Sequence, residues 1–161
     1  MKILGIDPGY ERVGIAIIEK EDGKENLLYS DCFKTSAKLP HEERLALISG
    51  KIESVIVQYS PDALAIEKLF FGSNQKTAMK VSEARGVVIN ECSSRGMKVF
   101  EYTPIQIKVA VTGYGRSDKA GVIKMVPNLI KINKEIKYDD EYDAIATGLT
   151  FFASEKFIHK K

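Results

Sequence analysis

Short apolar runs alternate with longer amphipathic segments along this chain. Apolar residues at 3–6 end on Asp7, a Pro-Gly turn follows at once, and a second apolar run occupies 13–18. This pattern predicts a strand, a tight turn and a second strand that pairs back on the first. Asp7 then lies at the tip of a central strand, where a buried carboxylate needs a positive partner. Asp-Pro-Gly is also good turn chemistry, so this stretch alone leaves a turn-forming acid and a functional acid equally open.

Apolar spacing along the rest of the chain predicts an α/β protein. A third strand is expected at 27–36, at an edge of the sheet, and shorter strands at 62–66 and 97–101. Helices are expected at 40–59 with Pro40 as the first helical residue, at 76–95, from 104, from 118 and from about 138. Pro127 should end or kink the fourth helix early, because proline lacks the amide proton that a helix interior needs.

Length and composition are those of an ordinary globular domain. With 161 residues, 44% apolar and 29% charged, we expect one domain over 1–161, with a tail that frays from about residue 155. No run approaches the ~18 apolar residues of a membrane span, and the N-terminus lacks a secretory signal pattern. Cys32 and Cys92 lie far apart without metal-ligand spacing, which favours reduced thiols. The sequence therefore predicts a cytoplasmic protein without a membrane segment.

Charge is distributed unevenly, although the net charge is only +2. Residues 68–98 carry six Lys and Arg against two Asp and Glu, and residues 104–137 carry seven against two, whereas both ends of the chain are acidic. A positive face beside an acidic site suits a polyanion such as nucleic acid. A basic segment is also typical of a solvated surface, so the charge pattern needs support from other features.

Acidic residues recur where predicted elements begin or end. The strand at 62–66 ends on Glu67, as the first strand ends on Asp7. The last helix opens with four acids in five residues, and Asp140 and Asp143 project from one face because they are three residues apart. The helix dipole favours negative charge there, and N-terminal capping explains one or two of these acids. Four acids exceed what capping requires.

A cluster of Asp and Glu without His or Cys selects a hard divalent cation, Mg²⁺ or Mn²⁺. The two histidines, His41 and His159, lie at a helix start and in the tail. Two such ions about 4 Å apart can clamp a phosphodiester, one activating the attacking water and the other stabilising the leaving 3′ oxygen. Nearby lysines would neutralise the charge that develops on the phosphate.

The ordered set of motifs resembles the RuvC Holliday-junction resolvase family of the RNase H-like nuclease superfamily. The matching motifs are Gly5 to Gly9, Ile66-Glu67, Phe70, Glu83 to Gly86, Lys108, Gly113 to Gly115, Lys119 and Asp140 to Ala146. They cover nearly the whole chain in the right order. The resemblance implies an RNase H-like α/β fold, with a mixed five-stranded sheet flanked by helices on both faces. It also implies a structure-selective endonuclease that cuts four-way DNA junctions by paired symmetric nicks in recombination and repair.

The same resemblance implies roles for individual residues. A metal-binding catalytic tetrad holding two Mg²⁺, with Mn²⁺ as a substitute, would consist of Asp7, Glu67, Asp140 and Asp143. Lys108 and Lys119 match basic residues that support cleavage or bind the scissile backbone. Phe70 matches the aromatic residue that inserts at the junction and unstacks a base. Further candidate DNA contacts are Lys76, Lys80, Arg85 and Arg116.

The implied partners are four-way junction DNA, a second copy of the chain and a branch-migration complex. The helix at 76–95 would form the homodimer contact, and two active sites would then face two strands of like polarity. The sequence leaves the cleavage-site preference and the strength of the dimer open.

Some features depart from the family pattern or leave alternatives open. Val13-Gly14 stands where the family commonly has Thr-Gly, and Pro127 is unusual in the helix that carries Lys119. Asp139 and Glu141 are extra acids beside Asp140, so the ligand at that corner stays open. A ribosomal-RNA-processing nuclease of the same superfamily and a non-cleaving junction-binding protein are the alternatives, and the four acids argue against the second. Actin-like ATPases and sugar kinases share the opening strand pattern but need far more than 161 residues.

Overall fold

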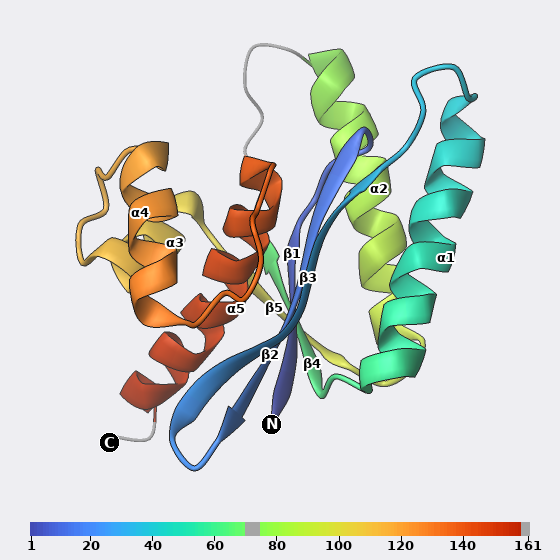
Figure 1. Cartoon of the computed structure of the whole chain (residues 1–161). Coiled ribbons are helices and arrows are strands. Elements are labelled where there is room, and N and C mark those ends of the chain that lie inside the picture. Colours follow the sequence, from blue (N-terminus) through green and yellow to red (C-terminus); the bar gives the residue numbers. More distant parts are fainter. Residues whose placement is uncertain (70–74, 159–161) are drawn as a thin grey trace.

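Within residues 1–69 and 75–158, the part of the chain that the computed structural model describes, five strands form one mixed sheet (Figure 1). The strands are β1 (Lys2–Asp7), β2 (Arg12–Glu21), β3 (Lys24–Lys34), β4 (Ala63–Glu67) and β5 (Lys98–Tyr102). The helices are α1 (His41–Tyr59), α2 (Gln75–Ser93), α3 (Pro104–Thr112), α4 (Lys119–Leu129) and α5 (Asp139–Ile158). Helices α1 and α2 cover one face of the sheet, and α3, α4 and α5 cover the other. The mixed five-stranded α/β architecture expected from the sequence is confirmed.

Strand β1 lies at the centre of the sheet, whose order is β3-β2-β1-β4-β5. It pairs antiparallel with β2 and parallel with β4, and Ile6 stands opposite Ile66. Asp7 and Glu67 are the next residues along their strands. The register therefore brings both carboxylates to the same end of the sheet, where β1 and β4 both finish, as the apolar runs predicted.

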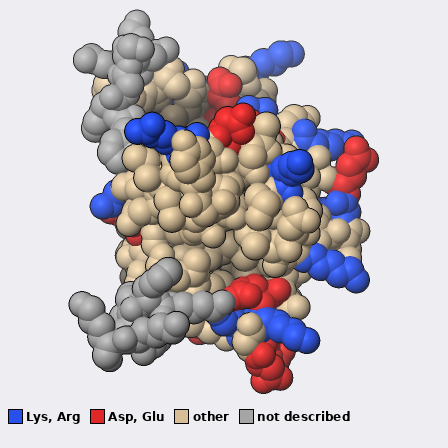
Figure 2. Space-filling view, turned by 90° about the vertical axis from the view of Figure 1, so that its left-hand side faces the viewer, with Lys and Arg blue, Asp and Glu red and all other residues tan. Residues whose placement is uncertain are grey.

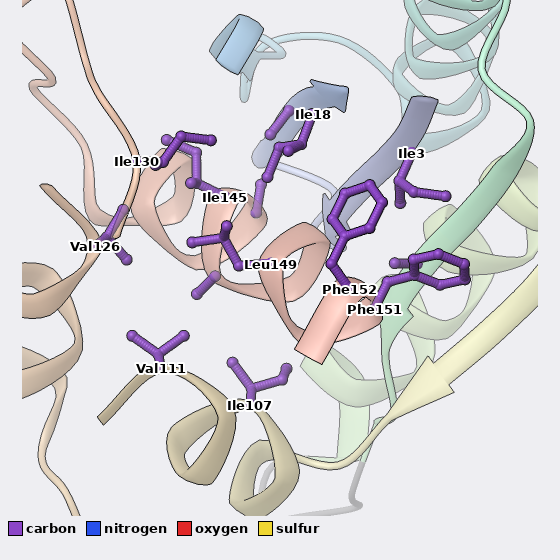
Figure 3. Packing of buried hydrophobic residues seen from close by; sticks show 14 of the residues in the cluster. Ile3, Ile18, Ile107, Val111, Val126, Ile130, Ile145, Leu149, Phe151 and Phe152 are labelled. Atoms are coloured by element: carbon purple, nitrogen blue, oxygen red, sulfur yellow. The ribbon is translucent and has the colours of Figure 1, made fainter. Parts of the chain in front are cut away.

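The alternation of side chains along a strand decides which helices these acids face. In β1, Leu4 and Ile6 are buried with α1 and α2, whereas Ile3 is buried with α3, α4 and α5. Asp7 is four residues after Ile3 in the same strand, so both side chains point to the same face of the sheet. Asp7 therefore faces α5. Figure 3 shows apolar side chains of β1, β2, α3, α4 and α5 packed together in this second core. Phe151 closes it with an edge-to-face contact to Phe100 at 4.9 Å between ring centroids.

Helix α5 approaches β1 and β2 unusually closely because the strands present glycines to it. A Cβ atom at Gly14 would clash with the backbone carbonyl oxygen of Asp140, and one at Gly5 would clash with the carbonyl oxygen of Ala144. On the helix, a Cβ atom at Gly148 would lie 2.9 Å from Cδ1 of Ile18. These contacts fix how far the acidic first turn of α5 lies from the end of β1.

At two helices, α1 and α4, the expectation about a proline differs from the structure. Pro40 precedes α1 as its N-cap residue instead of being its first helical residue. Helix α4 continues two residues past Pro127, and it ends where the amide of Ile130 donates to the carbonyl oxygen of Val126. The helix thus tolerates the one amide proton that Pro127 lacks for two further residues, and the expected kink stays a prediction.

The N-terminal ends of α3 and α4 agree with the helix starts expected at 104 and 118 to within one residue. Thr103 and Gln106 form a capping box at α3, and Asp118 caps α4 by accepting from the amide of Gly121. Helix α5 continues to Ile158, and residues 159–161 lie outside the described part, so the frayed tail stays a prediction. Across the described residues, no helix combines the length and apolar character needed to cross a membrane.

We predict that Gly14→Ala destabilises the protein, because the added methyl group would push α5 off the sheet through a backbone contact. The expected loss in the free energy of unfolding is roughly 2–4 kcal/mol, as for overpacking at a rigid site. Urea denaturation followed by circular dichroism measures it. Gly50→Ala is the matched control, since Gly50 is an exposed residue of α1 and an added Cβ atom there would have no atom within 4 Å. This control should stabilise by up to about 1 kcal/mol; equal stability of both variants would contradict the close-packing argument.

Candidate active site

Two carboxylates reach the edge of the sheet from adjacent strands. Burial raises the pKa of Asp7 well above its usual range, and the negative charges of Asp143 and Glu67 raise it further. Burial and the charge of Asp143 together raise the pKa of Glu67 to about 6. Raised pKa values of this kind indicate that the buried carboxylates repel one another and have too little positive charge nearby.

Helix α5 brings Asp143 to this end of the sheet. Burial raises the pKa of Asp143, although hydrogen bonding to Lys119 opposes the effect. Asp143 lines a hollow of about 380 Å³ together with Asp7 and Glu67. Three acids far apart in the sequence therefore line one cavity.

The described residues that line this hollow combine acidic, basic and apolar side chains: Asp7, Glu67, Asp143, Lys108, Lys119, Pro104, Ile107 and Val122. Helix α3 supplies Lys108 and α4 supplies Lys119. Both lysines that the resemblance singled out therefore lie beside the three acids. Three carboxylates and two ammonium groups around one cavity suit the binding of a cation and of an anionic ester.

Lys119 is bound to the acids of α5. Its Nζ lies 2.5 Å from Oδ2 of Asp139 and 2.9 Å from Oδ2 of Asp143. Partial burial opposes the charged form, but these carboxylates outweigh it and raise the pKa of Lys119. The hydrogen bond from Lys119 in turn lowers the pKa of Asp139. The ammonium group thus supplies part of the positive charge that the acids lack.

Asp140 is oriented differently from the three acids in the hollow. Its Oδ2 lies 3.1 Å from Nε of Arg12, the first residue of β2, and 3.9 Å from Sγ of Cys32. Its charge still raises the pKa of Asp7, so the carboxylate remains close to the cluster. Sequence reasoning missed this role of Arg12, because spacing along the chain does not show which acid it meets.

The two alternative acids beside Asp140 have other partners. Asp139 pairs with Lys119 and lies 4.0 Å from Nη2 of Arg12. Glu141 is buried, and Nζ of Lys134 lies 2.5 Å from its carboxylate while also donating to the carbonyl oxygen of Ser30. Lys134 therefore links Glu141 of α5 to Ser30 of β3, and Glu141 is not among the described residues that line the hollow.

The expected DNA contacts are placed unevenly. Lys80 and Arg116 are exposed, on α2 and in the loop before α4. Arg85 is only 16% exposed, because it pairs with Glu101 and donates from Nε to the backbone oxygen of Glu67 at 3.1 Å. Arg85 thereby holds the end of β4 in place. Phe70 and the side chain of Lys76 lie outside the described residues.

The basic segment 104–137 does not form one continuous positive surface. Figure 2 shows the α3–α4 side of the molecule, where Lys and Arg lie around a broad uncharged area. Exposed apolar side chains of this region are Ile105, Val109, Tyr114 and Leu129. The charge count along the sequence therefore overstated how far the positive charge is gathered on one face.

The donor set fits a hard divalent cation in its chemistry, because all four acids offer oxygen ligands and three have raised pKa values. In the described part of the chain, however, no three His, Cys, Asp or Glu side chains converge on one ion position. Asp140 is paired with Arg12, and Asp143 with Lys119. A cation would have to replace these internal partners.

Comparison with known proteins identifies the family. A family model described as Crossover junction endodeoxyribonuclease RuvC matches residues 3–151. Relatives of that name from Finegoldia magna and Halothermothrix orenii are 43% and 44% identical, cover 98% and 92% of this chain, and are themselves covered to 96% and 90%.

Solved structures agree with this assignment. The structure of T. thermophilus RuvC in complex with Holliday junction substrate has a TM-score of 0.90 at 31% identity, covering 98% of this chain and 96% of that chain. The yeast mitochondrial Holliday junction resolvase Ydc2, 11% identical with a TM-score of 0.71 over 98% of this chain and 80% of its own, shares the fold. The RNase H-like α/β fold is thus confirmed, and the chain belongs to the RuvC family of crossover junction endodeoxyribonucleases.

Proposed function

We propose that this chain is a divalent-metal-dependent endonuclease that resolves four-way DNA junctions by paired symmetric nicks. The observation that carries the proposal is the hollow in which Asp7, Glu67 and Asp143 meet Lys108 and Lys119. Family membership supports the choice of substrate, since the relative from T. thermophilus was solved with a Holliday junction. The setting would be recombination and DNA repair in the cytoplasm.

The residues that would hold the metal are Asp7, Glu67, Asp143 and, after it leaves Arg12, Asp140. Two Mg²⁺, or Mn²⁺ in their place, would activate a water molecule and stabilise the leaving 3′ oxygen when bound. The repulsion among the buried carboxylates favours this binding, because each added positive charge relieves it. The strand ends keep Asp7 and Glu67 fixed, so binding requires movement mainly of the α5 side chains.

The two lysines would act on the phosphate. Lys108 lines the hollow from α3 and would neutralise charge on a scissile phosphate placed there. Lys119 is engaged with Asp139 and Asp143, so we expect it to turn to the DNA backbone once a cation takes over Asp143. An ammonium group suits this role because it is a compact point charge on a flexible stem.

Contacts to the arms of the junction would come from residues around the hollow. Lys80 and Arg116 are exposed, so their charged ends can reach phosphates. Lys76 and Phe70 keep the roles that the resemblance implies, phosphate binding and base unstacking. Arg85 would act on DNA mainly through Glu67, whose backbone it holds.

We expect a homodimer whose contact runs along α2. An open groove of about 490 Å³ between α1 and α2 is lined in part by Leu45, Ala46, Gly86 and Val87, and Met79 on α2 is 61% exposed. Such small and apolar residues support close approach of a second copy. Two active sites would then face strands of like polarity, and a branch-migration complex would supply the junction.

The direct test is cleavage of a synthetic mobile four-way junction against a linear duplex of the same sequence, in Mg²⁺ and in EDTA. We predict paired nicks in opposing strands, on the junction only and with metal only. Glu67→Gln should lower the cleavage rate by roughly a hundredfold or more, since it removes a charged ligand from the hollow. Junction affinity, measured by gel shift in Ca²⁺, should change little.

The control is Glu21→Gln, which alters an exposed acid at the end of β2 and should cut like wild type. Cleavage of RNA or linear duplex instead would move the function to another nuclease of the superfamily. Junction binding without cutting in both Mg²⁺ and Mn²⁺ would refute the nuclease proposal.

The raised pKa of Glu67 predicts how stability depends on pH without metal. Between its ordinary value of 4.5 and about 6, the folded state holds a proton that the unfolded state has lost. The stabilisation this gives is present below 4.5 and is lost as the pH rises through 6. Glu67→Gln should therefore stabilise the protein in EDTA at pH 7.5 by about 1–2 kcal/mol, and the gain should vanish near pH 4.5. Urea denaturation at both pH values measures it, and a variant less stable than wild type at pH 7.5 would contradict the predicted repulsion.

A further inference from the structure

The pairing of Asp140 with Arg12 separates one acid of the proposed metal site from the other three. Nε of Arg12 lies 3.1 Å from Oδ2 of Asp140. Asp7, Glu67 and Asp143 line the hollow, and Asp140 is not among the residues that line it in the described chain. The carboxylate of Asp140 is thus paired with the guanidinium group of Arg12 instead of lining the hollow.

The fold holds Arg12 beside the first turn of α5. Arg12 begins β2, and Gly14, two residues further on, packs directly against the backbone oxygen of Asp140. The guanidinium also lies 4.0 Å from Asp139 and 5.7 Å from the centroid of the Tyr138 ring. Three consecutive residues at the start of α5 therefore surround the same cationic group.

The exposure of the two partners decides what this pair can do. The side chain of Arg12 is 45% exposed and that of Asp140 is 17% exposed. A pair of this kind contributes little to folding, because solvent screens it. An ion pair at this distance can nevertheless bias the rotamer of a short side chain such as Asp140.

We propose that Arg12 is a positioning residue that holds Asp140 outside the metal site until a divalent cation binds, and so weakens the affinity of the site for metal. This inference rests on the proposed function, since it takes Asp140 as a metal ligand. A cation must break the ion pair to gain its fourth carboxylate, and the positive charge of Arg12 also repels it. The pairing of Lys119 with Asp143 acts in the same direction, but Lys119 itself lines the hollow.

The test measures binding of Mn²⁺ alone, without DNA, by the loss of the electron paramagnetic resonance signal of the free ion. Arg12→Gln removes the pairing cation. Lys34→Gln is the matched control, because Lys34 also stands at this end of the sheet but lies over the Tyr138 ring at 3.6 Å. Asp140→Asn, alone and combined with Arg12→Gln, removes the acid. Thermal unfolding in EDTA checks that each variant is folded, and Arg12→Lys provides a second, milder change.

We expect Arg12→Gln to lower the dissociation constant for Mn²⁺ roughly three- to tenfold, which corresponds to one partly exposed ion pair. Arg12→Lys should give a smaller change in the same direction. Asp140→Asn should weaken binding, and adding Arg12→Gln to it should restore less than roughly twofold, because the partner is gone. Lys34→Gln should change the constant by less than roughly twofold, because salt screens an exposed charge that acts only from a distance.

Unchanged or weaker Mn²⁺ binding by Arg12→Gln would overturn the inference, since Arg12 would then be neutral or would hold Asp140 in place for the metal. An equal gain from Lys34→Gln would also overturn it, because general charge would explain the effect. If Asp140→Asn leaves Mn²⁺ binding intact, the assignment of the metal ligands fails as well. If Asp140→Asn weakens Mn²⁺ binding but Arg12→Gln leaves it unchanged, the inference about Arg12 fails while the proposed metal ligands and function stand.

Discussion

The arrangement of the site depends on the close approach of α5 to β1 and β2. Gly5 and Gly14 leave no side chain between the strands and the helix, so the backbone of Asp140 and Ala144 lies against the sheet. The approach sets the distance between the first turn of α5 and the acid at the end of β1. A larger residue at either glycine would move Asp140 and Asp143 together, because both lie near the start of α5.

This packing creates an electrostatic cost that the protein offsets with its own cations. Buried Asp7, Glu67 and Asp143 repel one another, which raises their pKa values. Lys119 pairs with Asp143, and Arg12 with Asp140. These ion pairs place positive charge beside the acid cluster of the folded chain. On the inference proposed above, the same pairs would also lower the affinity of the site for a metal.

The spacing of apolar residues predicted the strands and helices of the fold. The acids could be singled out because they lie where these elements begin or end. Apolar runs that end on Asp7 and Glu67 predicted two strands with an acid at the same end, and the pairing of β1 with β4 agrees. The three-residue spacing predicted that Asp140 and Asp143 project from one face of a helix, but only Asp143 lines the hollow. Partners of side chains could not be predicted in this way. The pairing of Arg12 with Asp140, of Lys134 with Glu141 and of Arg85 with Glu101 depends on elements that meet only in the folded chain. The summed charge of 104–137 also overstated how far positive charge gathers on one face, because Lys and Arg lie around a broad uncharged area on the α3–α4 side (Figure 2).

Asp7, Glu67, Asp140 and Asp143 are proposed to form one divalent-metal site where β1, β4 and α5 meet. A crystal structure of the protein soaked in Mn²⁺, with anomalous difference maps, tests it most directly. We expect anomalous peaks coordinated by Asp7, Glu67 and Asp143, with Asp140 turned from Arg12 toward a peak. Crystals that take up Mn²⁺ only elsewhere, with Asp140 still paired to Arg12 and the hollow without a peak, would contradict it.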